Sequence, residues 1–283
     1  MSPSCPYILP DAELDRFYAE DVPFGDLTSR TLGLGHQPGR MLFQARGAMV
    51  ACCTEEAARL IERAGGRVER CVPSGSPRQP GDEVLSASGP AAGLLAAWKV
   101  AQTLVETASG IATAAATIVA MARAVAPGIG IACTRKTLPG TRAVAVKAIL
   151  AGGASPHRLG LSDSVLLFPE HRAFFPDQPL DAMIAELKAA CPERKIVVEV
   201  TDAKSAVAAA EARADVVQLE KFSPDAVAWV INAIGKRACV IAAAGGVNAG
   251  NAAAYAAAGA DVLVTSSPYW APPADIAVTI TPA

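Results

Sequence analysis

The sequence lacks an excess of basic residues. Its 25 Lys and Arg are outnumbered by 27 Asp and Glu, which gives a net charge of −2 and a pI near 6.0. Nucleic-acid-binding domains usually carry a basic excess, so we expect no nucleic-acid partner. Two nucleotide-binding loops are also missing, because the chain contains neither G-x-G-x-x-G nor G-x-x-x-x-G-K-[ST]. Any positive charge that recognises an anion must therefore be concentrated locally.

The seven cysteines lack the spacing of a zinc site or a disulfide framework. Their number is odd, no C-x-x-C occurs, and Cys52 and Cys53 are adjacent. This usage is typical of a reducing compartment, so we predict a cytoplasmic protein whose thiols are mostly buried. The first residues, MSPSCPYILPDAELDRF, also lack the charged-then-apolar order of a signal peptide.

Long uninterrupted apolar runs are missing as well. The stretch 91–126 is apolar, but Lys99, Glu106 and Arg123 interrupt it. It therefore predicts buried helices rather than a membrane span, and we expect no membrane partner.

The first 110 residues predict a small unit of helices and short strands. Turn residues separate short apolar stretches, and Thr54 and Gly65 have the positions of an N-cap and a helix end. Helices are expected over 11–19 and 54–66, and strands within 39–53, 67–72 and 82–89.

The rest of the chain alternates apolar runs with Ala-rich helical segments. The last four runs begin 19, 23 and 23 residues apart, which indicates regular β/α units and a parallel sheet. We predict a barrel or near-barrel, with a doubly wound open sheet as the alternative. The expected strands are 129–134, 164–168, 196–200, 215–219, 238–242 and 261–265.

Polar residues follow or end these runs. In β/α barrels the chemistry lies at the carboxyl ends of the strands, so we expect these residues to converge. They are Arg135 and Lys136, His157 and Arg158, Glu199, Glu220 and Lys221, Gly245 and Gly246, and Ser266.

This set of residues suits an anionic substrate that has a pyrophosphate leaving group. Arginine and lysine bind carboxylate or phosphate oxygens. Glu199 and Glu220 could hold Mg²⁺ or stabilise a developing positive charge. A helix expected near Asn248, directly after Gly245 and Gly246, would place backbone N–H groups on a phosphate.

Each residue also has a simpler interpretation. Arg135 and Arg158 could be surface residues, and His157 could be a packing histidine. Glu199 is the sharpest signal, because a carboxylate in a buried strand needs a partner, for which we expect Lys136 or a metal. A Schiff-base lyase that uses Lys136 or Lys221 is a further alternative.

These motifs together resemble nicotinate-nucleotide pyrophosphorylase, that is, quinolinate phosphoribosyltransferase. The resemblance spans nearly the whole chain and includes Glu20-Asp21 and Gly25-Asp26-Leu27-Thr28. It is carried by the segments SGIAT at 109–113, TRKTLPG at 134–140, HRLGL at 157–161, LEKFSP at 219–224 and GGV at 245–247.

The resemblance implies a type II phosphoribosyltransferase that needs Mg²⁺. It implies an N-terminal α/β sandwich domain over residues 1–110, on which the tail 268–283 packs, and an incomplete parallel β/α barrel over 111–267. It also implies a homodimer with shared active sites, and phosphoribosyl pyrophosphate and an aromatic carboxylic acid as substrates. Arg135, His157 and Arg158 would bind the acidic ring, and Lys136, a catalytic residue with Glu199 and Glu220, would help to bind the ring or the phosphate. Glu199 and Glu220 would stabilise the ribosyl cation or hold the metal, and Gly245, Gly246 and Ser266 would bind the phosphate.

The sequence departs from the family pattern at the proposed site. Phe168 stands where a lysine is expected, and Lys99 replaces an arginine that the family lends across its dimer. Glu220, Lys221, Ala244 and Ser266 also replace the family's Asp, Asn, Ser and Gly. The segment 168–171, FPEH, resembles the ModD group of pyrophosphorylases associated with molybdenum transport. An authentic NAD-pathway enzyme and a non-catalytic molybdate binder are the alternatives.

Overall fold

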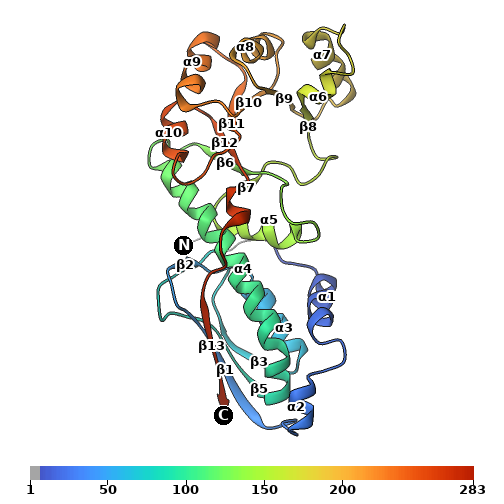
Figure 1. Ribbon diagram of the computed structural model, residues 1–283, viewed down its shortest axis with the longest axis vertical. Coiled ribbons are helices and arrows are strands. Elements are labelled where there is room, and N and C mark those ends of the chain that lie inside the picture. The colour runs from blue at the N-terminus through green and yellow to red at the C-terminus, as the bar shows by residue number, and fades with distance from the viewer. Residues whose placement is uncertain (1–6) are drawn as a thin grey trace. The chain divides into compact units, whose positions relative to one another are not determined.

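The computed structural model describes residues 7–283, and the chain forms two compact units (Figure 1). The first unit contains residues 7–116 together with 138–153 and 268–283, and the second contains 117–137 and 154–267. This division differs from the predicted sequence boundary at residue 110, because a segment from the middle of the chain joins the first unit. Cys5 lies outside the described residues.

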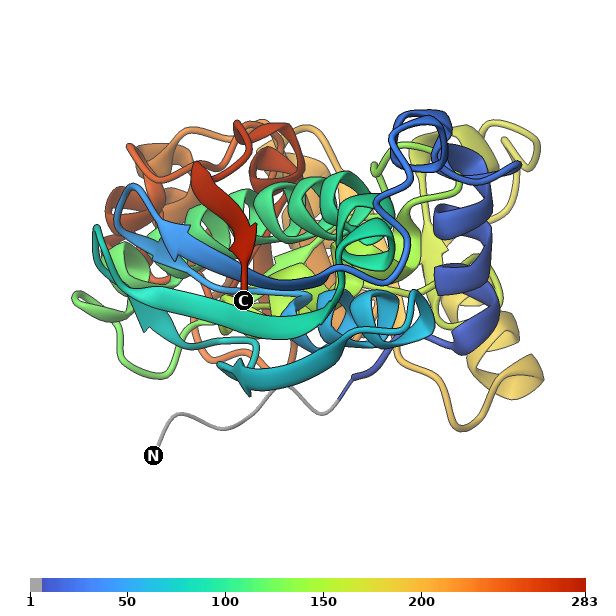
Figure 2. The ribbon, with the colours of Figure 1, turned by 90° about the horizontal axis from the view of Figure 1, so that it is seen from below.

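The first unit is built on a four-stranded antiparallel sheet with the order β13-β1-β5-β3. Alternate residues of β1 face the core, where Met41 and Phe43 are buried. The C-terminal strand β13 pairs with β1 and lies beside it in Figure 2, which assigns the C-terminal tail to this unit. Its strands are β1 (Pro38–Ala45), β2 (Met49–Val50), β3 (Arg67–Cys71), β4 (Pro77–Arg78), β5 (Glu83–Pro90) and β13 (Ile276–Pro282); its helices include α1 (Asp11–Asp21), α2 (Leu27–Thr31), α3 (Thr54–Arg63) and α5 (Arg142–Ala151).

The start of α3 differs from its prediction. The N-cap is Cys53, with φ 58°, and Thr54 is already the first helical residue. The hydroxyl of Thr54 donates to the carbonyl of Val72 at 2.6 Å instead of capping the helix. The predicted N-cap at Thr54 is therefore wrong, because its hydroxyl makes a tertiary hydrogen bond.

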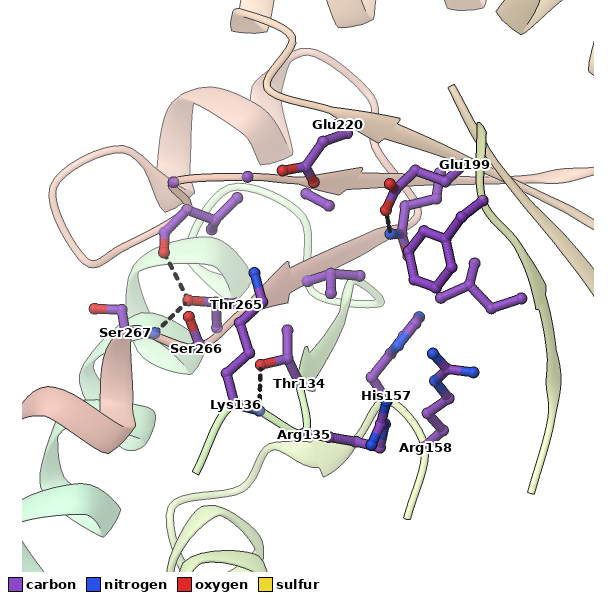
Figure 3. A pocket seen from close by; sticks show the side chains of 18 of the residues that line it. Thr134, Arg135, Lys136, His157, Arg158, Glu199, Glu220, Thr265, Ser266 and Ser267 are labelled. Atoms are coloured by element: carbon purple, nitrogen blue, oxygen red, sulfur yellow. Dashed lines mark hydrogen bonds between the residues drawn. The ribbon is translucent and has the colours of Figure 1, made fainter. Parts of the chain in front are cut away.

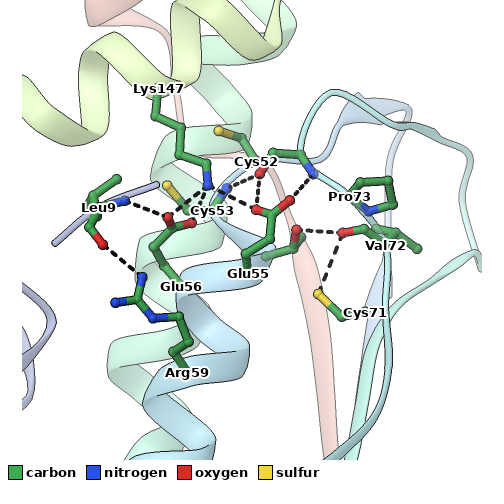
Figure 4. Close-up of polar contacts among 12 residues, drawn as sticks. Leu9, Cys52, Cys53, Glu55, Glu56, Arg59, Cys71, Val72, Pro73 and Lys147 are labelled. Carbon is green, nitrogen blue, oxygen red and sulfur yellow. Dashed lines mark hydrogen bonds and ion pairs between the residues drawn. The ribbon is translucent and has the colours of Figure 1, made fainter. Parts of the chain in front are cut away.

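A buried ion cluster explains why residues 138–153 join the first unit. Lys147 of α5 is fully buried, and its Nζ lies 2.6 Å from Oε2 of Glu56 and 3.0 Å from Oε2 of Glu55 (Figure 4). Glu56 also accepts the backbone N–H of Leu9 at 3.0 Å. The cluster thus fastens α5 and the segment before α1 to α3.

The helix α4 (Ala91–Arg123) is one continuous helix where the sequence predicted several. By length and composition it could cross a membrane, but 56% of its most apolar window is buried inside the protein, as in the core helix of a soluble protein. At Gly110 a Cβ would lie 2.2 Å from the carbonyl oxygen of Pro272. The helix therefore needs glycine where the C-terminal segment crosses it.

The second unit is a curled sheet of seven parallel strands, in the order β7-β6-β12-β11-β10-β9-β8. The predicted incomplete barrel is confirmed, and the open doubly wound sheet is wrong. Side chains that follow the two edge strands meet, since the guanidinium of Arg158, after β7, lies 5.7 Å from the ring centroid of Phe168, after β8. The strands are β6 (Gly130–Cys133), β7 (Ser155–Pro156), β8 (Val165–Leu167), β9 (Ile196–Val200), β10 (Val216–Glu220), β11 (Val240–Ala244) and β12 (Val262–Thr265). The helices are α6 (Pro169–Arg172), α7 (Leu180–Ala190), α8 (Ala203–Glu211), α9 (Pro224–Ile234) and α10 (Ala252–Ala257), and a 3₁₀ turn, η1 (Ser267–Trp270), follows β12.

Small residues line the inside of the curled sheet. Ala132, Ala242, Ala244 and Val264 form a cluster of buried residues there, and Val216 and Val262 pack against it. Alanine side chains fill little of the space that a larger core residue would occupy. The composition of this face therefore leaves a cavity at one end of the barrel.

Candidate active site

The carboxyl ends of the β-strands surround a cavity of about 470 Å³ in the second unit (Figure 3). Its wall includes all the predicted site residues except Lys99 and Lys221. Each strand contributes side chains because parallel strands end at the same rim of a barrel. They are Arg135 and Lys136 after β6, His157 and Arg158 after β7, Phe168 after β8, Glu199 on β9, Gln218 and Glu220 on β10, Gly245 and Gly246 after β11, and Thr265 and Ser266 at the end of β12.

Lys99 lies on α4 in the first unit. Its Nζ donates to Oε1 of Gln102 at 3.2 Å and lies 4.0 Å from the centre of the Trp98 ring. It is not among the residues that line the cavity. Its predicted contribution across a dimer stays a prediction.

Three cationic or ionisable donors form one corner of the cavity. Arg158 is buried, and burial, together with the neighbouring charge of Arg135, lowers its pKa. Burial and the charge of Arg158 likewise lower the pKa of His157, so this imidazole is mostly neutral near pH 7. The backbone N–H of His157 donates to the carbonyl of Cys133 at 2.8 Å, which fixes it at the strand end. A carboxylate bound here would offset the repulsion between the two guanidinium groups.

Phe168 gives this corner an aromatic wall. The Arg158 guanidinium lies over its ring at 5.7 Å, which is within the range of a cation–π interaction. The backbone N–H of Phe168 donates to Nδ1 of His171 at 3.0 Å, and the two rings are 5.6 Å apart. His171 therefore orients the residue that replaces the lysine expected from the family pattern.

Glu199 has a different partner from the one predicted. Its Oε2 accepts a hydrogen bond from Nε2 of Gln218 at 2.6 Å, whereas the sequence indicated Lys136 or a metal. Burial raises the pKa of Glu199, and the charges of Glu220 and Glu170 act in the same direction. The hydrogen bond from Gln218 and the charge of Lys136 oppose this shift. Lys136 thus acts on Glu199 only through its charge.

Sequence reasoning missed Gln218, although a signal was present. In the strand VVQLE, Gln218 stands opposite Glu199 of β9, and both residues occupy strands that are otherwise largely apolar. A polar residue at an inward position of a buried strand needs a partner. The NH₂ group of Gln218 is therefore the partner of the Glu199 carboxylate in the neighbouring strand.

The glycine turn after β11 is open toward the cavity but is not followed directly by a helix. Gly245 and Gly246 have φ of 84° and 97°. The expected helix near Asn248 is wrong, because α10 begins at Ala252. Asn248 and Asn251 instead donate from their side-chain amides to the carbonyl of Gly246, each at 3.0 Å. A phosphate here would meet a glycine turn rather than a helix dipole.

Thr265 is another residue that the sequence analysis did not single out. Its Oγ1 donates to the carbonyl of Val247 at 2.6 Å and accepts from the backbone N–H of Ser267 at 3.0 Å. It therefore joins the glycine turn to the end of β12, on either side of Ser266.

The carboxylates of this cavity are compatible with Mg²⁺. No cluster of three or more His, Cys, Asp or Glu side chains suited to a metal occurs within residues 7–283. Mg²⁺ does not need one, because it usually keeps several waters and binds one or two carboxylates together with substrate phosphates. Glu199 and Glu220 line the same cavity, and the charge of Glu220 is one of the causes that raise the pKa of Glu199. They fit a cation shared with a phosphate-bearing ligand.

Two family models match adjoining parts of the chain. The N-terminal domain of quinolinate phosphoribosyl transferase matches residues 26–109, and the C-terminal domain matches residues 111–279. The protein named "Putative pyrophosphorylase ModD" from Rhodobacter capsulatus is 51% identical over 248 residues, covering 87% of this chain and 96% of its own length. The nicotinate-nucleotide pyrophosphorylase [carboxylating] of Rattus norvegicus is 32% identical over 223 residues, covering 77% and 74%.

The fold is similar to that of solved structures of lower identity. The nicotinate-nucleotide pyrophosphorylase from Francisella tularensis superposes with a TM-score of 0.88 at 20% identity, covering 97% of this chain and 98% of the other. This similarity concerns the fold alone. The resemblance inferred from the sequence motifs is confirmed by the family models and by the ModD relative.

Proposed function

Because the chain belongs to the quinolinate phosphoribosyltransferase family of pentosyltransferases, we propose that it transfers phosphoribose from phosphoribosyl pyrophosphate to an acidic aromatic acceptor. The observation that carries the proposal is the placement of opposite charges in one cavity. Arg135, His157 and Arg158 lie in one corner of the cavity. Glu199 and Glu220 line the same cavity near the glycine turn.

The proposed reaction exchanges one bond at C1 of the ribose for another. The bond from C1 to the pyrophosphate oxygen breaks, its electron pair leaves with pyrophosphate, and a ring nitrogen of the acceptor forms the new bond to C1. Glu199 and Glu220 would stabilise the positive charge that develops on the ribosyl ring. Arg135, His157 and Arg158 would hold the acceptor carboxylate so that the ring is oriented for attack.

Lys136, Gly245, Gly246 and Ser266 would bind the phosphate groups. Glycine lets the backbone approach a phosphate closely, and Lys136 offers a mobile ammonium group. We propose Glu199 and Glu220 as the residues that hold Mg²⁺. When bound, the ion would neutralise charge on the leaving pyrophosphate.

Binding of the donor tests the proposal most directly. We expect Mg²⁺-dependent heat on titration of the wild type with phosphoribosyl pyrophosphate, and an affinity at least about tenfold lower for Glu199→Gln, because a charged contact is lost. Glu211→Gln, on α8, is the matched control and should bind as the wild type does. A wild type that binds no phosphoribosyl pyrophosphate would contradict the proposal.

The identity of the acceptor is tested separately with quinolinate. Phe168, which replaces the lysine expected from the family pattern, favours an acceptor other than quinolinate, and the resemblance of residues 168–171 to the ModD group motivates the proposal of a role linked to molybdenum transport. The identity to the rat enzyme favours the alternative of an authentic carboxylating pyrophosphorylase. Formation of nicotinate mononucleotide from quinolinate and phosphoribosyl pyrophosphate in the presence of Mg²⁺ would support the authentic carboxylating pyrophosphorylase.

A non-catalytic oxyanion binder is the second candidate. It is favoured by the convergence of Arg135, Arg158 and His157 in one corner, where no carboxylate hydrogen-bonds them among the contacts of the described chain. Calorimetry with molybdate and with sulfate as control tests it. Equal heats of binding for molybdate and sulfate, or no heat for either, would contradict the oxyanion-binder hypothesis. The homodimer and the cytoplasmic setting stay predictions.

A further inference from the structure

Gln218 carries a buried acceptor that lacks a donor. The residue is 4% exposed, and its Oε1 has no hydrogen-bond partner in the described part of the protein. A buried carbonyl oxygen without a donor destabilises the folded state, and native proteins rarely leave one. Since Gln218 lines the cavity, a ligand in the cavity can supply the missing donor.

The orientation of this amide is set by Glu199. An ionised carboxylate only accepts hydrogen bonds, so the NH₂ group of Gln218 must face it, and Nε2 lies 2.6 Å from Oε2. The amide oxygen is therefore directed away from Glu199. The residues in register with Gln218 on the two neighbouring strands are Glu199 of β9 and Ala242 of β11, and neither offers a side-chain donor to it.

The pair lies at the end of the cavity where the acceptor ring would bind. Glu199 belongs to β9, which pairs with β8, and Phe168 follows β8 at the same rim. Arg158 in turn lies over the ring of Phe168. The glycine turn that would receive the phosphate belongs to β11, on the other side of β10 from Glu199. Gln218 thus lies beside Glu199 at the reacting centre, one strand farther from Phe168 and next to the strand that carries the glycine turn.

We propose that Gln218 is a specificity-determining residue, which selects an aromatic carboxylate carrying an N–H or O–H donor that the amide oxygen accepts. The proposal rests on the proposed function, because it assigns this end of the cavity to the acceptor. It names a substrate class that a site lined only by cations would not select. Phe168 contributes the flat surface, and Arg158 the contact to the carboxylate.

Matched ligands test this inference in the intact protein. Nicotinate and its 2-, 5- and 6-amino derivatives are titrated by calorimetry near pH 8 in the presence of Mg²⁺, with the corresponding methyl derivatives as controls of similar size. We expect the wild type to prefer the amino over the methyl ligand by about tenfold or more at one ring position at least, since one buried acceptor is satisfied. Gln218→Met, which has a similar length and lacks a carbonyl, should lose that preference.

Binding of phosphoribosyl pyrophosphate to the same samples separates the two hypotheses. Retained donor binding by Gln218→Met, together with the lost amino preference, supports the assignment to the acceptor. A lost donor affinity with an unchanged amino preference would show that a ribose hydroxyl satisfies Gln218, and this overturns the proposal. Equal binding of amino and methyl ligands by the wild type, or binding of none of them, overturns it as well.

The outcome for the proposed function is read independently. A wild type that binds no phosphoribosyl pyrophosphate contradicts phosphoribosyl transfer, whatever its ligand preference. Far-UV circular dichroism and thermal unfolding of Gln218→Met confirm that the variant is folded. If it is not, the amino-against-methyl comparison in the wild type still decides whether a donor is selected.

Discussion

Lys147 and Glu56 are both completely buried, and their charged atoms lie 2.6 Å apart in the core of the first unit. Glu55 adds a second carboxylate at 3.0 Å, and it is partly exposed. Removal of the lysine would leave an unpaired carboxylate in the core, which is among the most destabilising changes that a single substitution makes.

We therefore expect Lys147→Met to lower the free energy of unfolding by about 3–5 kcal/mol. Urea denaturation followed by circular dichroism measures it. Lys188→Met is the matched control, because the ion pair between Lys188 and Asp215 at 3.1 Å is partly exposed and should contribute at most about 1 kcal/mol. Equal losses for the two variants would contradict the importance of the buried cluster.

The glycine turn gives a second prediction. At Gly245 a Cβ would lie 2.6 Å from the backbone nitrogen of Lys221 and 2.8 Å from Oε1 of Glu220, whereas nothing lies within 4 Å at Gly246. Both positions have positive φ, so alanine costs about 1–3 kcal/mol of backbone strain at each. Gly245→Ala should lose more stability than Gly246→Ala and should also weaken binding of phosphoribosyl pyrophosphate. Chemical denaturation and calorimetry of the two variants side by side check the difference.

Phe168 gives a third prediction. Phe168→Lys places a cation beside Arg158 in the acceptor corner and should raise the affinity for the dicarboxylate quinolinate by about tenfold, because charged hydrogen bonds are added. The backbone contact of residue 168 with His171 does not depend on the side chain and should persist. Phe168→Leu, which removes the ring and adds no charge, is the control. A quinolinate affinity that rises equally in both variants would show that space, not charge, limits binding.

The raised pKa of Glu199 predicts how binding depends on pH. Burial disfavours the ionised form, yet the ionised form is the one that would hold Mg²⁺ and the ribosyl cation. Affinity for phosphoribosyl pyrophosphate should therefore fall as the pH drops through the raised pKa. Gln218→Met removes a hydrogen bond that stabilises the carboxylate, so its acid limb should move to higher pH. Affinities of the wild type and of Gln218→Met measured from pH 5 to 9 test both expectations. If the loss of affinity at acid pH occurs at the same pH in the two proteins, a group other than Glu199 causes it.

The same shift has a consequence for stability. A carboxyl group whose folded-state pKa is raised opposes folding above that pKa, and the penalty is relieved as the pH falls into the window between the raised value and the ordinary value near 4.5. Glu199→Gln should thus be at least as stable as the wild type at neutral pH while it binds the donor less well. Thermal unfolding at neutral pH measures the change, and a large loss of stability would indicate a structural role for the charge.

Much of the barrel could be predicted from the sequence, because its order follows from local patterns. The strand IVVEV coincides with β9, and the positions of Arg135, Glu220 and Gly245 at strand ends placed them at one rim. The two-residue strand β7 was missed, since two residues carry no periodicity. Its position nevertheless brings His157 and Arg158 to the cavity.

The contacts that sequence reasoning missed connect residues far apart in the chain. Lys147 and Glu56 are separated by 91 residues, and nothing near either one indicates the other. The pairing of Gln218 with Glu199 depends on the register between two strands. The predicted N-cap role of Thr54 is wrong because its hydroxyl donates instead to the carbonyl of Val72, 18 residues along the chain.

The segment 138–153, which Lys147 fastens to the first unit, has a consequence for the chain as a whole. It begins two positions after Lys136 and ends four positions before His157, and the chain passes between the two units at four places. No single cut can therefore release an intact barrel from the sandwich. Lys136 and His157, which would bind the substrate, flank a segment whose stability is set by contacts in the first unit. A substitution that destabilises α5 should therefore weaken substrate binding although it changes no residue of the cavity.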